Sequence, residues 1–297
     1  MRRAVVVVNP ASGGGRTERL WRDLRDDLQT IGLDFDWAAT TRRGHAIELA
    51  RAAAEAGASL VVAVGGDGTL NEVVNGVTRE DGVGPTVSAV LTGRGRDASR
   101  NFGLSLDTRI AARALVHGVD TRFDLIRAAF ADGTPRYVVT AAGSGFDAAV
   151  ARRAVVGGRQ GTLPYVSAIL KTMASHATVP TEIEVDGVVA WTGRLSTAVV
   201  ANGAYYGGGM KIAPSADPAD GHLDLVVLGD LGRLEFLRWL PRVYSGGHLA
   251  NRKVVTRRAR RVTIRPASPL PVHADGEPTG ETPVTFDLCP GALRLRR

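Results

Sequence analysis

The chain has 297 residues, of which 44% are hydrophobic and 23% are charged, a composition typical of a soluble globular protein with room for two domains. Its apolar runs are much shorter than a bilayer span and its one cysteine, Cys289, excludes an intrachain disulfide, so we expect a cytoplasmic protein. The net charge is +7 and aromatic residues make up only 5%, which favours phosphorylated or anionic-lipid partners and argues against a nucleic-acid partner.

The first 120 residues alternate between strand and helix patterns. Apolar or alternating runs predict strands at 4–8, 33–37, 60–64 and 86–91. Apolar residues spaced three and four apart predict helices around 21–31, 46–53, 70–77 and 108–117. Repeated strand–helix units imply a parallel sheet that is covered on both faces.

The most informative segment is the string Val64-Gly65-Gly66-Asp67-Gly68-Thr69-Leu70-Asn71-Glu72. Its glycines let the backbone approach a ligand closely, and the helix that follows offers N–H groups to an anion. Asp67 adds a carboxylate that suits Mg²⁺ or an ordered water beside that anion. The string therefore predicts a phosphate site, with an ordinary strand-to-helix turn as the alternative.

Four loops follow the carboxyl ends of the predicted strands, where parallel sheets bind their ligands. They comprise residues 9–16, 40–44, 65–69 and 93–97, and each combines glycine with polar or charged residues. Only three of the 37 basic residues are lysine, and none precedes Lys171. A cation that holds phosphate in this half of the chain must therefore be arginine.

From about Arg122 the pattern becomes strand-rich, with hairpin signals at Asp132-Gly133 and Asp186-Gly187. Helical patterns interrupt it around 146–156, 163–177 and 234–244, and residues 252–295 are again strand-rich. We predict an α/β domain over residues 1–121 and a mainly antiparallel β-sandwich domain over residues 122–297. Whether a C-terminal strand near 290–297 returns to the first domain stays open.

Several further strings occur in one order along the chain. They are Asn9-Pro10-Ala11-Ser12-Gly13, the string at 65–72, Gly93-Arg94-Gly95-Arg96-Asp97, Gly143-Ser144-Gly145-Phe146-Asp147-Ala148, Tyr206-Gly207-Gly208-Gly209, Asp220-Gly221-His222-Leu223-Asp224 and Asp275-Gly276-Glu277. Together they resemble the diacylglycerol kinase/sphingosine kinase superfamily, especially its bacterial soluble lipid kinases, over nearly the whole chain. The first glycine string alone is shared with NAD kinases and phosphofructokinases, which implies an N-terminal domain of their type.

The resemblance implies an ATP-dependent lipid kinase that phosphorylates a hydroxyl of diacylglycerol or a related lipid. Glu277 matches the family's proposed proton acceptor for that hydroxyl, and Asp67, Asp97 and Asp124 would organise the catalytic Mg²⁺. The implied nucleotide-binding residues are Asn9, Ser12, Arg16, Thr40, Gly65, Gly66, Asp67, Gly68, Thr69, Leu70, Asn71, Glu72 and Arg94.

A second acidic site is predicted at Asp217 and Asp220, because paired carboxylates beside a glycine turn suit Mg²⁺. The resemblance adds the backbone carbonyl of His222 as a ligand of this structural magnesium. An exposed acidic turn without metal is the alternative.

The third loop departs from the family pattern GTGND, because Arg94 replaces the threonine and Arg96 the asparagine. Thr140 likewise stands where the family usually has asparagine. A non-catalytic nucleotide- or lipid-binding protein is therefore one alternative to a lipid kinase. An NAD kinase, which shares the first glycine string, is another. As partners we expect a lipid substrate in the membrane and peripheral contact with anionic membranes, and we leave a homodimer open.

Overall fold

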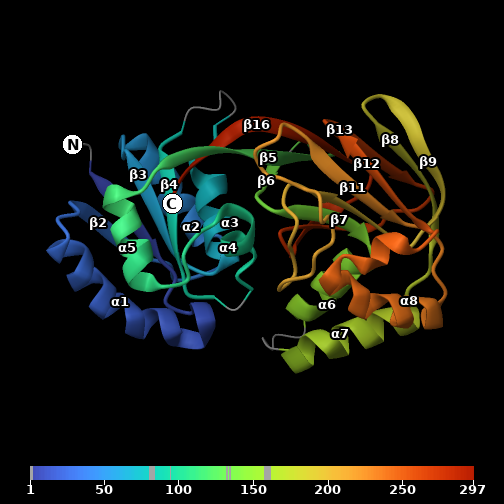
Figure 1. Cartoon of the computed structure of the whole chain (residues 1–297), viewed down its shortest axis with the longest axis horizontal. Helices are drawn as coiled ribbons and strands as arrows, with labels where there is room; N and C mark the ends of the chain where they lie inside the picture. The colour runs from blue at the N-terminus through green and yellow to red at the C-terminus, as the bar shows by residue number, and fades with distance from the viewer. Residues whose placement is uncertain (1–2, 80–83, 94, 132, 134, 157–161) are drawn as a thin grey trace. The chain divides into compact units, whose positions relative to one another are not determined.

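The chain divides into two compact units in the structure, which is a computed structural model. Unit 1 comprises Met1–Leu125 and Pro290–Arg297, and unit 2 comprises Ile126–Cys289. Two strands, β5 (Asp120–Phe130) and β16 (Val284–Arg296), contribute residues to both units (Figure 1). The structure describes residues 3–79, 84–93, 95–131, 133, 135–156 and 162–297.

Unit 1 contains a parallel sheet with the strand order β2-β1-β3-β4. Its strands are β1 (Ala4–Val8), β2 (Phe35–Ala39), β3 (Leu60–Gly65) and β4 (Thr86–Leu91). The last residues of β16 join this sheet parallel to β4, through the pair Leu295 and Val87. The predicted parallel α/β fold is therefore confirmed, and all residues of β3 and β4 are buried, as in a sheet covered on both faces.

The helices of unit 1 follow the strands along the chain: α1 (Ser12–Thr30), α2 (His45–Glu55), α3 (Asp67–Val77), α4 (Asp97–Phe102) and α5 (Thr108–His117). Side chains of α1 and α5, including Trp21, Leu28 and Leu115, form one core with the sheet. Helices α2 and α3 pack on each other and on β3. The sequence pattern does not predict α4, because six residues are too few to show a helical period.

Unit 2 contains the antiparallel part of the ten-stranded sheet that begins with β2-β1-β3-β4, together with a second, six-stranded antiparallel sheet. In the first, β16 pairs with β13 (Arg261–Pro266), β13 pairs with β8 (Val179–Val185), and β8 pairs with β9 (Val188–Leu195). Strand β5 pairs with β16 and with β6 (Pro135–Val138). The second has the order β12-β11-β10-β7-β14-β15. Its strands are β7 (Ala141–Gly145), β10 (Thr197–Ala201), β11 (Leu223–Leu228), β12 (Val254–Ala259), β14 (Pro271–Ala274) and β15 (Glu277–Glu281).

One hydrophobic core joins the two sheets of unit 2, with Ile183, Ile264 and Phe286 from the first sheet and Val200 and Leu225 from the second. This is the arrangement of a β-sandwich, and it confirms the predicted fold of this half. The helical segments are α6 (Phe146–Val156), α7 (Thr162–Ser175), α8 (Arg233–Trp239), η1 (Leu240–Ser245) and η2 (Gly247–Ala250). Among the described residues, no helix is both long and apolar enough to span a bilayer.

Candidate functional site

Three of the four predicted loops meet at the carboxyl ends of β1, β3 and β4 in unit 1. The side-chain amide of Asn9 donates to Oγ1 of Thr69 at 3.0 Å, which links the first loop to the glycine string. The backbone N–H of Thr92 donates to the carbonyl of Gly65 at 2.7 Å, which links β4 to β3 where both strands end. The convergence predicted from the parallel sheet is thus present in the described residues.

Glycine is required where these loops touch. A Cβ on Gly93 would lie 2.7 Å from Cα of Gly66, and a Cβ on Gly13 would lie 2.9 Å from the carbonyl oxygen of Thr92. Contacts this short leave no room for a side chain. The loops therefore pack backbone against backbone at these two points.

Asp67 ties the glycine string to α4. Its Oδ1 accepts the N–H of Ala98 at 3.1 Å and its Oδ2 accepts the N–H of Asp97 at 3.4 Å. Oδ2 of Asp67 and Oδ2 of Asp97 also face Gly95, since a Cβ there would lie 2.4 and 3.9 Å from them. Two carboxylate oxygens thus border one small space that a side chain at position 95 would fill, and hard oxygen ligands of this kind suit a hydrated Mg²⁺.

Arginines lie near Asp97 and Gly93. Arg100 donates to Oδ1 of the buried Asp97 at 3.0 Å and to the carbonyl of Gly95 at 2.7 Å. Arg96 is exposed and, with Arg16, lines a small hollow beside Gly93. Two guanidinium groups at one hollow suit a phosphorylated ligand. Arg94, the other predicted arginine of this loop, lies outside the described residues.

Other predicted nucleotide-binding residues have structural contacts. The carboxylate of Glu72 accepts the backbone N–H groups of Gly44 and Ala46 at 3.0 and 3.1 Å, and so holds the start of α2. The N–H of Thr40 donates to the carbonyl of Val8. The side chains of Thr69, Leu70 and Asn71 are buried in α3, whereas Ser12 approaches Gly66. Thr69 and Leu70 also donate their N–H groups to the carbonyl of Gly66 in the first turn of α3.

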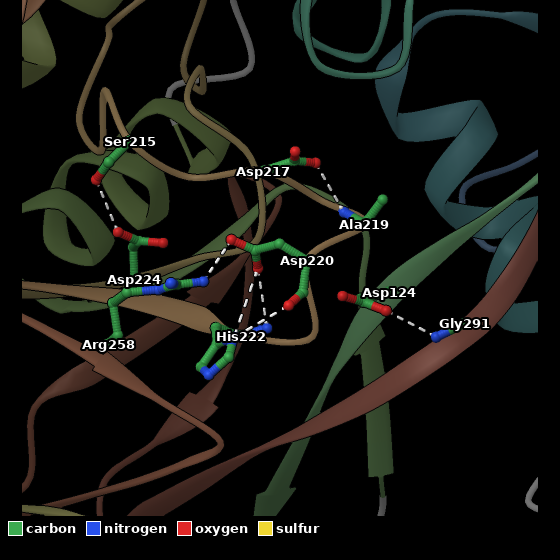
Figure 2. A network of polar contacts seen from close by, with 9 residues as sticks. All are labelled: Asp124, Ser215, Asp217, Ala219, Asp220, His222, Asp224, Arg258 and Gly291. Carbon is green, nitrogen blue, oxygen red and sulfur yellow. Dashed lines mark hydrogen bonds and ion pairs between the residues drawn. The ribbon is translucent and has the colours of Figure 1, made fainter.

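Asp124 is buried in β5, and its Oδ1 accepts the N–H of Gly291 at 2.7 Å (Figure 2). This bond joins β5 to β16 within unit 1. It is a structural contact that the sequence does not indicate, because the two residues are 167 positions apart.

In unit 2, Glu277 begins β15 immediately after a two-residue turn. Asp275 and Gly276 both have positive φ, 48° and 81°, as the favoured Asp-Gly hairpin turn requires. The carboxylate of Asp275 accepts the N–H groups of Val139, Thr140 and Ala141 at 2.7, 2.8 and 3.1 Å, and the hydroxyl of Thr140 at 2.5 Å. The turn that carries Glu277 is therefore fastened to the start of β7.

The acidic turn lies between β10 and β11 in the chain, and Figure 2 shows its two carboxylates pointing to different partners. Asp217 accepts the N–H of Ala219 at 3.0 Å, while Asp220 accepts the N–H of His222 and forms a short ion pair with Arg258. No three acidic or histidine side chains converge on a metal position among the described residues. A cation at this turn therefore requires Arg258 to move.

Asp224 lies beside the acidic turn and is largely buried. Burial raises the pKa of its carboxyl group, and the hydrogen bond from Ser215 opposes that rise. The Asp224 carboxylate adds negative charge next to Asp220. Its Oδ1 already accepts the hydroxyl of Ser215 at 2.9 Å.

Comparison with known proteins covers both units. Residues 3–128 match the diacylglycerol kinase catalytic domain, and residues 140–297 match the YegS C-terminal NAD kinase beta sandwich-like domain. Diacylglycerol kinases of Mycobacterium tuberculosis (strain H37Rv) and Bacillus subtilis (strain 168) are each 28% identical, over 99% and 96% of this chain and 95% and 93% of their own. The crystal structure of a diacylglycerol kinase from Bacillus anthracis (strain Sterne) has the same fold, with a TM-score of 0.74 at 20% identity, over 99% of this chain and 96% of that chain.

Proposed function

The chain belongs to the family of diacylglycerol kinases and YegS-type lipid kinases, and from this premise we propose that it is an ATP-dependent kinase that phosphorylates a hydroxyl group of diacylglycerol or a related lipid. The observation that carries the proposal is the joining of the glycine loops of unit 1 around Asp67 and Asp97. Phosphoryl transfer depends mainly on held phosphates and neutralised charge, and this surface offers both backbone N–H groups and arginines.

The nucleotide would lie against unit 1 and supply the phosphoryl group. The backbone of Gly66–Gly68, at the start of α3, would donate N–H groups to its phosphates, and Arg16 and Arg96 would neutralise charge from the neighbouring hollow. Asp67 and Asp97 would hold the accompanying Mg²⁺ through the oxygens that border Gly95.

Glu277 would accept the proton of the lipid hydroxyl. A general base needs a fixed position within about 3 Å of the proton that it removes. The turn that carries Glu277 is held by four hydrogen bonds to Asp275, so the backbone at this point is well defined.

The test is phosphate transfer from labelled ATP to a panel of diacylglycerol, monoacylglycerol, sphingoid base, ceramide, polyprenol and NAD. We expect a lipid product, and Glu277→Gln should lower kcat about 10²-fold or more without weakening ATP binding. Glu281→Gln is the matched control, because Glu281 lies on the same strand and is exposed beside Arg152. Product from NAD, or none from any acceptor, would contradict the proposal, and equal turnover in both variants would remove Glu277 from it.

Peripheral contact with anionic membranes is part of the same proposal, because the substrate resides in a bilayer and the chain carries a charge of +7. Helix α8 offers a suitable surface: Leu234 is 83% exposed and Leu237, one turn later, is 41% exposed, with Arg238 and Arg242 exposed nearby. Binding to phosphatidylglycerol vesicles should fall with salt and with Leu234→Glu. The control Val188→Glu, at a 69% exposed apolar site on β9, should bind like wild type. Salt-independent binding to neutral vesicles would contradict this account.

A further inference from the structure

Two motifs of unit 2 that the proposed reaction does not use meet at one buried histidine. His273, on β14, is 1% exposed, and its Nε2 lies 2.9 Å from Oδ2 of Asp147, at the start of α6. Its ring stacks on Tyr206, with the planes 7° apart and the centroids separated by 5.9 Å. Asp147 belongs to the string at 143–148, and Tyr206 begins the triple-glycine string.

Gly143 makes room for this pair. It lies directly opposite His273 in the pairing of β7 with β14. A Cβ at position 143 would lie 2.0 Å from Oδ2 of Asp147 and 2.8 Å from Nε2 of His273, so even alanine would displace the pair. The glycine of the motif is therefore explained by the pair that sits over it.

The hydrogen bonds determine which ring nitrogen of His273 carries the proton. Oδ1 of Asp147 is already used, since it accepts the hydroxyl of Thr197 and the N–H of Ala148, each at 2.7 Å. Oδ2 accepts from Nε2 of His273, which places the proton on Nε2 and leaves Nδ1 as an acceptor. Nδ1 then accepts the backbone N–H of Gly276 at 3.3 Å.

Gly276 immediately precedes Glu277. We propose that Asp147 and His273 are positioning residues for Glu277: Asp147 holds His273 in the form protonated on Nε2, and Nδ1 of His273 holds the N–H of Gly276. The Asp275 carboxylate fastens the turn to the start of β7, and His273 holds the N–H of Gly276, so two separate contacts fix the backbone that carries the Glu277 side chain. This inference rests on the proposed role of Glu277 in lipid phosphorylation.

Two substitutions of His273 distinguish the two hydrogen bonds that its ring forms, one with Asp147 and one with Gly276. The side chain of His273→Asn ends near the place of Nδ1, so it keeps an acceptor for Gly276 but does not reach Asp147. His273→Gln reaches toward Asp147 but lacks that acceptor. In Asp147→Asn, the new amide donates to Nε2 and moves the ring proton to Nδ1, which removes the acceptor as well.

Steady-state kinetics with ATP and the lipid acceptor is the first measurement. We expect His273→Gln and Asp147→Asn to lower kcat by about 10- to 100-fold with the KM for ATP unchanged, and His273→Asn to stay within about threefold of wild type. His248→Asn is the matched control, since His248 is also buried in unit 2 and bonds only a backbone carbonyl, that of Ile212, among the contacts of the described residues. It should lose stability while kcat stays unchanged. Equal loss of kcat in both His273 variants would overturn the proposal.

A readout independent of activity keeps this inference separate from the proposed function. In wild type, ¹⁵N chemical shifts should show His273 protonated on Nε2, and the Gly276 amide should exchange slowly with solvent. His273→Gln should speed that exchange at least tenfold, and His273→Asn should preserve it. If wild type phosphorylates no lipid, the proposed function fails, and these exchange rates still decide whether the turn is held as inferred. A proton on Nδ1, or unchanged exchange in His273→Gln, would overturn the inference.

Discussion

Asp275→Asn is the most informative single change, because the Asp275 carboxylate satisfies four donors at the start of β7. Oδ1 accepts the N–H of Thr140, the N–H of Ala141 and the Thr140 hydroxyl, and Oδ2 accepts the N–H of Val139. The residues that donate these bonds are buried, so water does not readily replace a lost acceptor. Asparagine tolerates the positive φ of this position at least as well as aspartate, so the change isolates the hydrogen bonds.

The magnitude follows from counting these bonds. If the asparagine oxygen stays on the side of Thr140, its amide group faces the N–H of Val139, and one buried donor loses its acceptor, at a cost of about 1–3 kcal/mol. The other three bonds lose the assistance of the charge, which adds about 1–2 kcal/mol in total. We expect a loss of about 2–5 kcal/mol in the free energy of unfolding, or roughly 4–20 °C in Tm for a unit of this size.

The assay is thermal unfolding followed by circular dichroism, together with kcat. Asp186→Asn is the matched control: Asp186 also has positive φ in an Asp-Gly turn, but among the described residues its carboxylate accepts only two N–H groups, those of Arg260 and Arg261, at an exposed site. Its loss should be about 1 kcal/mol or less. A Tm for Asp275→Asn within about 2 °C of wild type would refute the reasoning, since the four bonds would then contribute almost nothing.

Arg96 adopts a positive φ of 59°, where asparagine is favoured, so Arg96→Asn should raise the free energy of unfolding by up to about 1 kcal/mol. The same change removes a guanidinium group from the hollow and should weaken ATP binding about tenfold. Melting and isothermal titration check the two effects, and tighter ATP binding would contradict the account. Burial lowers the pKa of His176 and of His248, so the unfolded chain binds these protons more strongly than the folded chain. The stability that neutral rings provide is present above the unfolded pKa of about 6.5 and is lost as the pH falls through the lower folded values. Tm should therefore fall between pH 7.5 and 5.5, and by less in His248→Gln; an identical fall in both proteins would exclude His248. A structural Mg²⁺ at the acidic turn should raise Tm relative to EDTA, more strongly in Arg258→Ala, where Asp220 loses its competing cation, and not at all in Asp220→Ala. An equal change of Tm between Mg²⁺ and EDTA in wild type, Arg258→Ala and Asp220→Ala would show that the acidic turn does not bind Mg²⁺.

The sequence by itself determined the four strands of the first 120 residues, most helices and the glycine loops, because each depends on local geometry. The apolar run at 60–64 is a strand of a covered sheet, as predicted, and the predicted turn at Asp186-Gly187 has positive φ at both residues. The order of the motifs also sufficed to indicate the family, and some of their glycines mark positions where two backbones touch. Gly93 against Gly66 is the clearest instance.

Only the tertiary structure decided which groups meet. The cation paired with Asp97 is Arg100, in the last turn of a helix too short to predict. Glu72 holds the start of α2 by accepting backbone N–H groups of that helix. Asp147 and His273 are 126 residues apart, and no local pattern relates them. Hydrogen bonds of this kind depend on strand pairing and register, which come from packing over the whole chain. For that reason, the contacts that hold the turn before Glu277 became visible only in the folded protein.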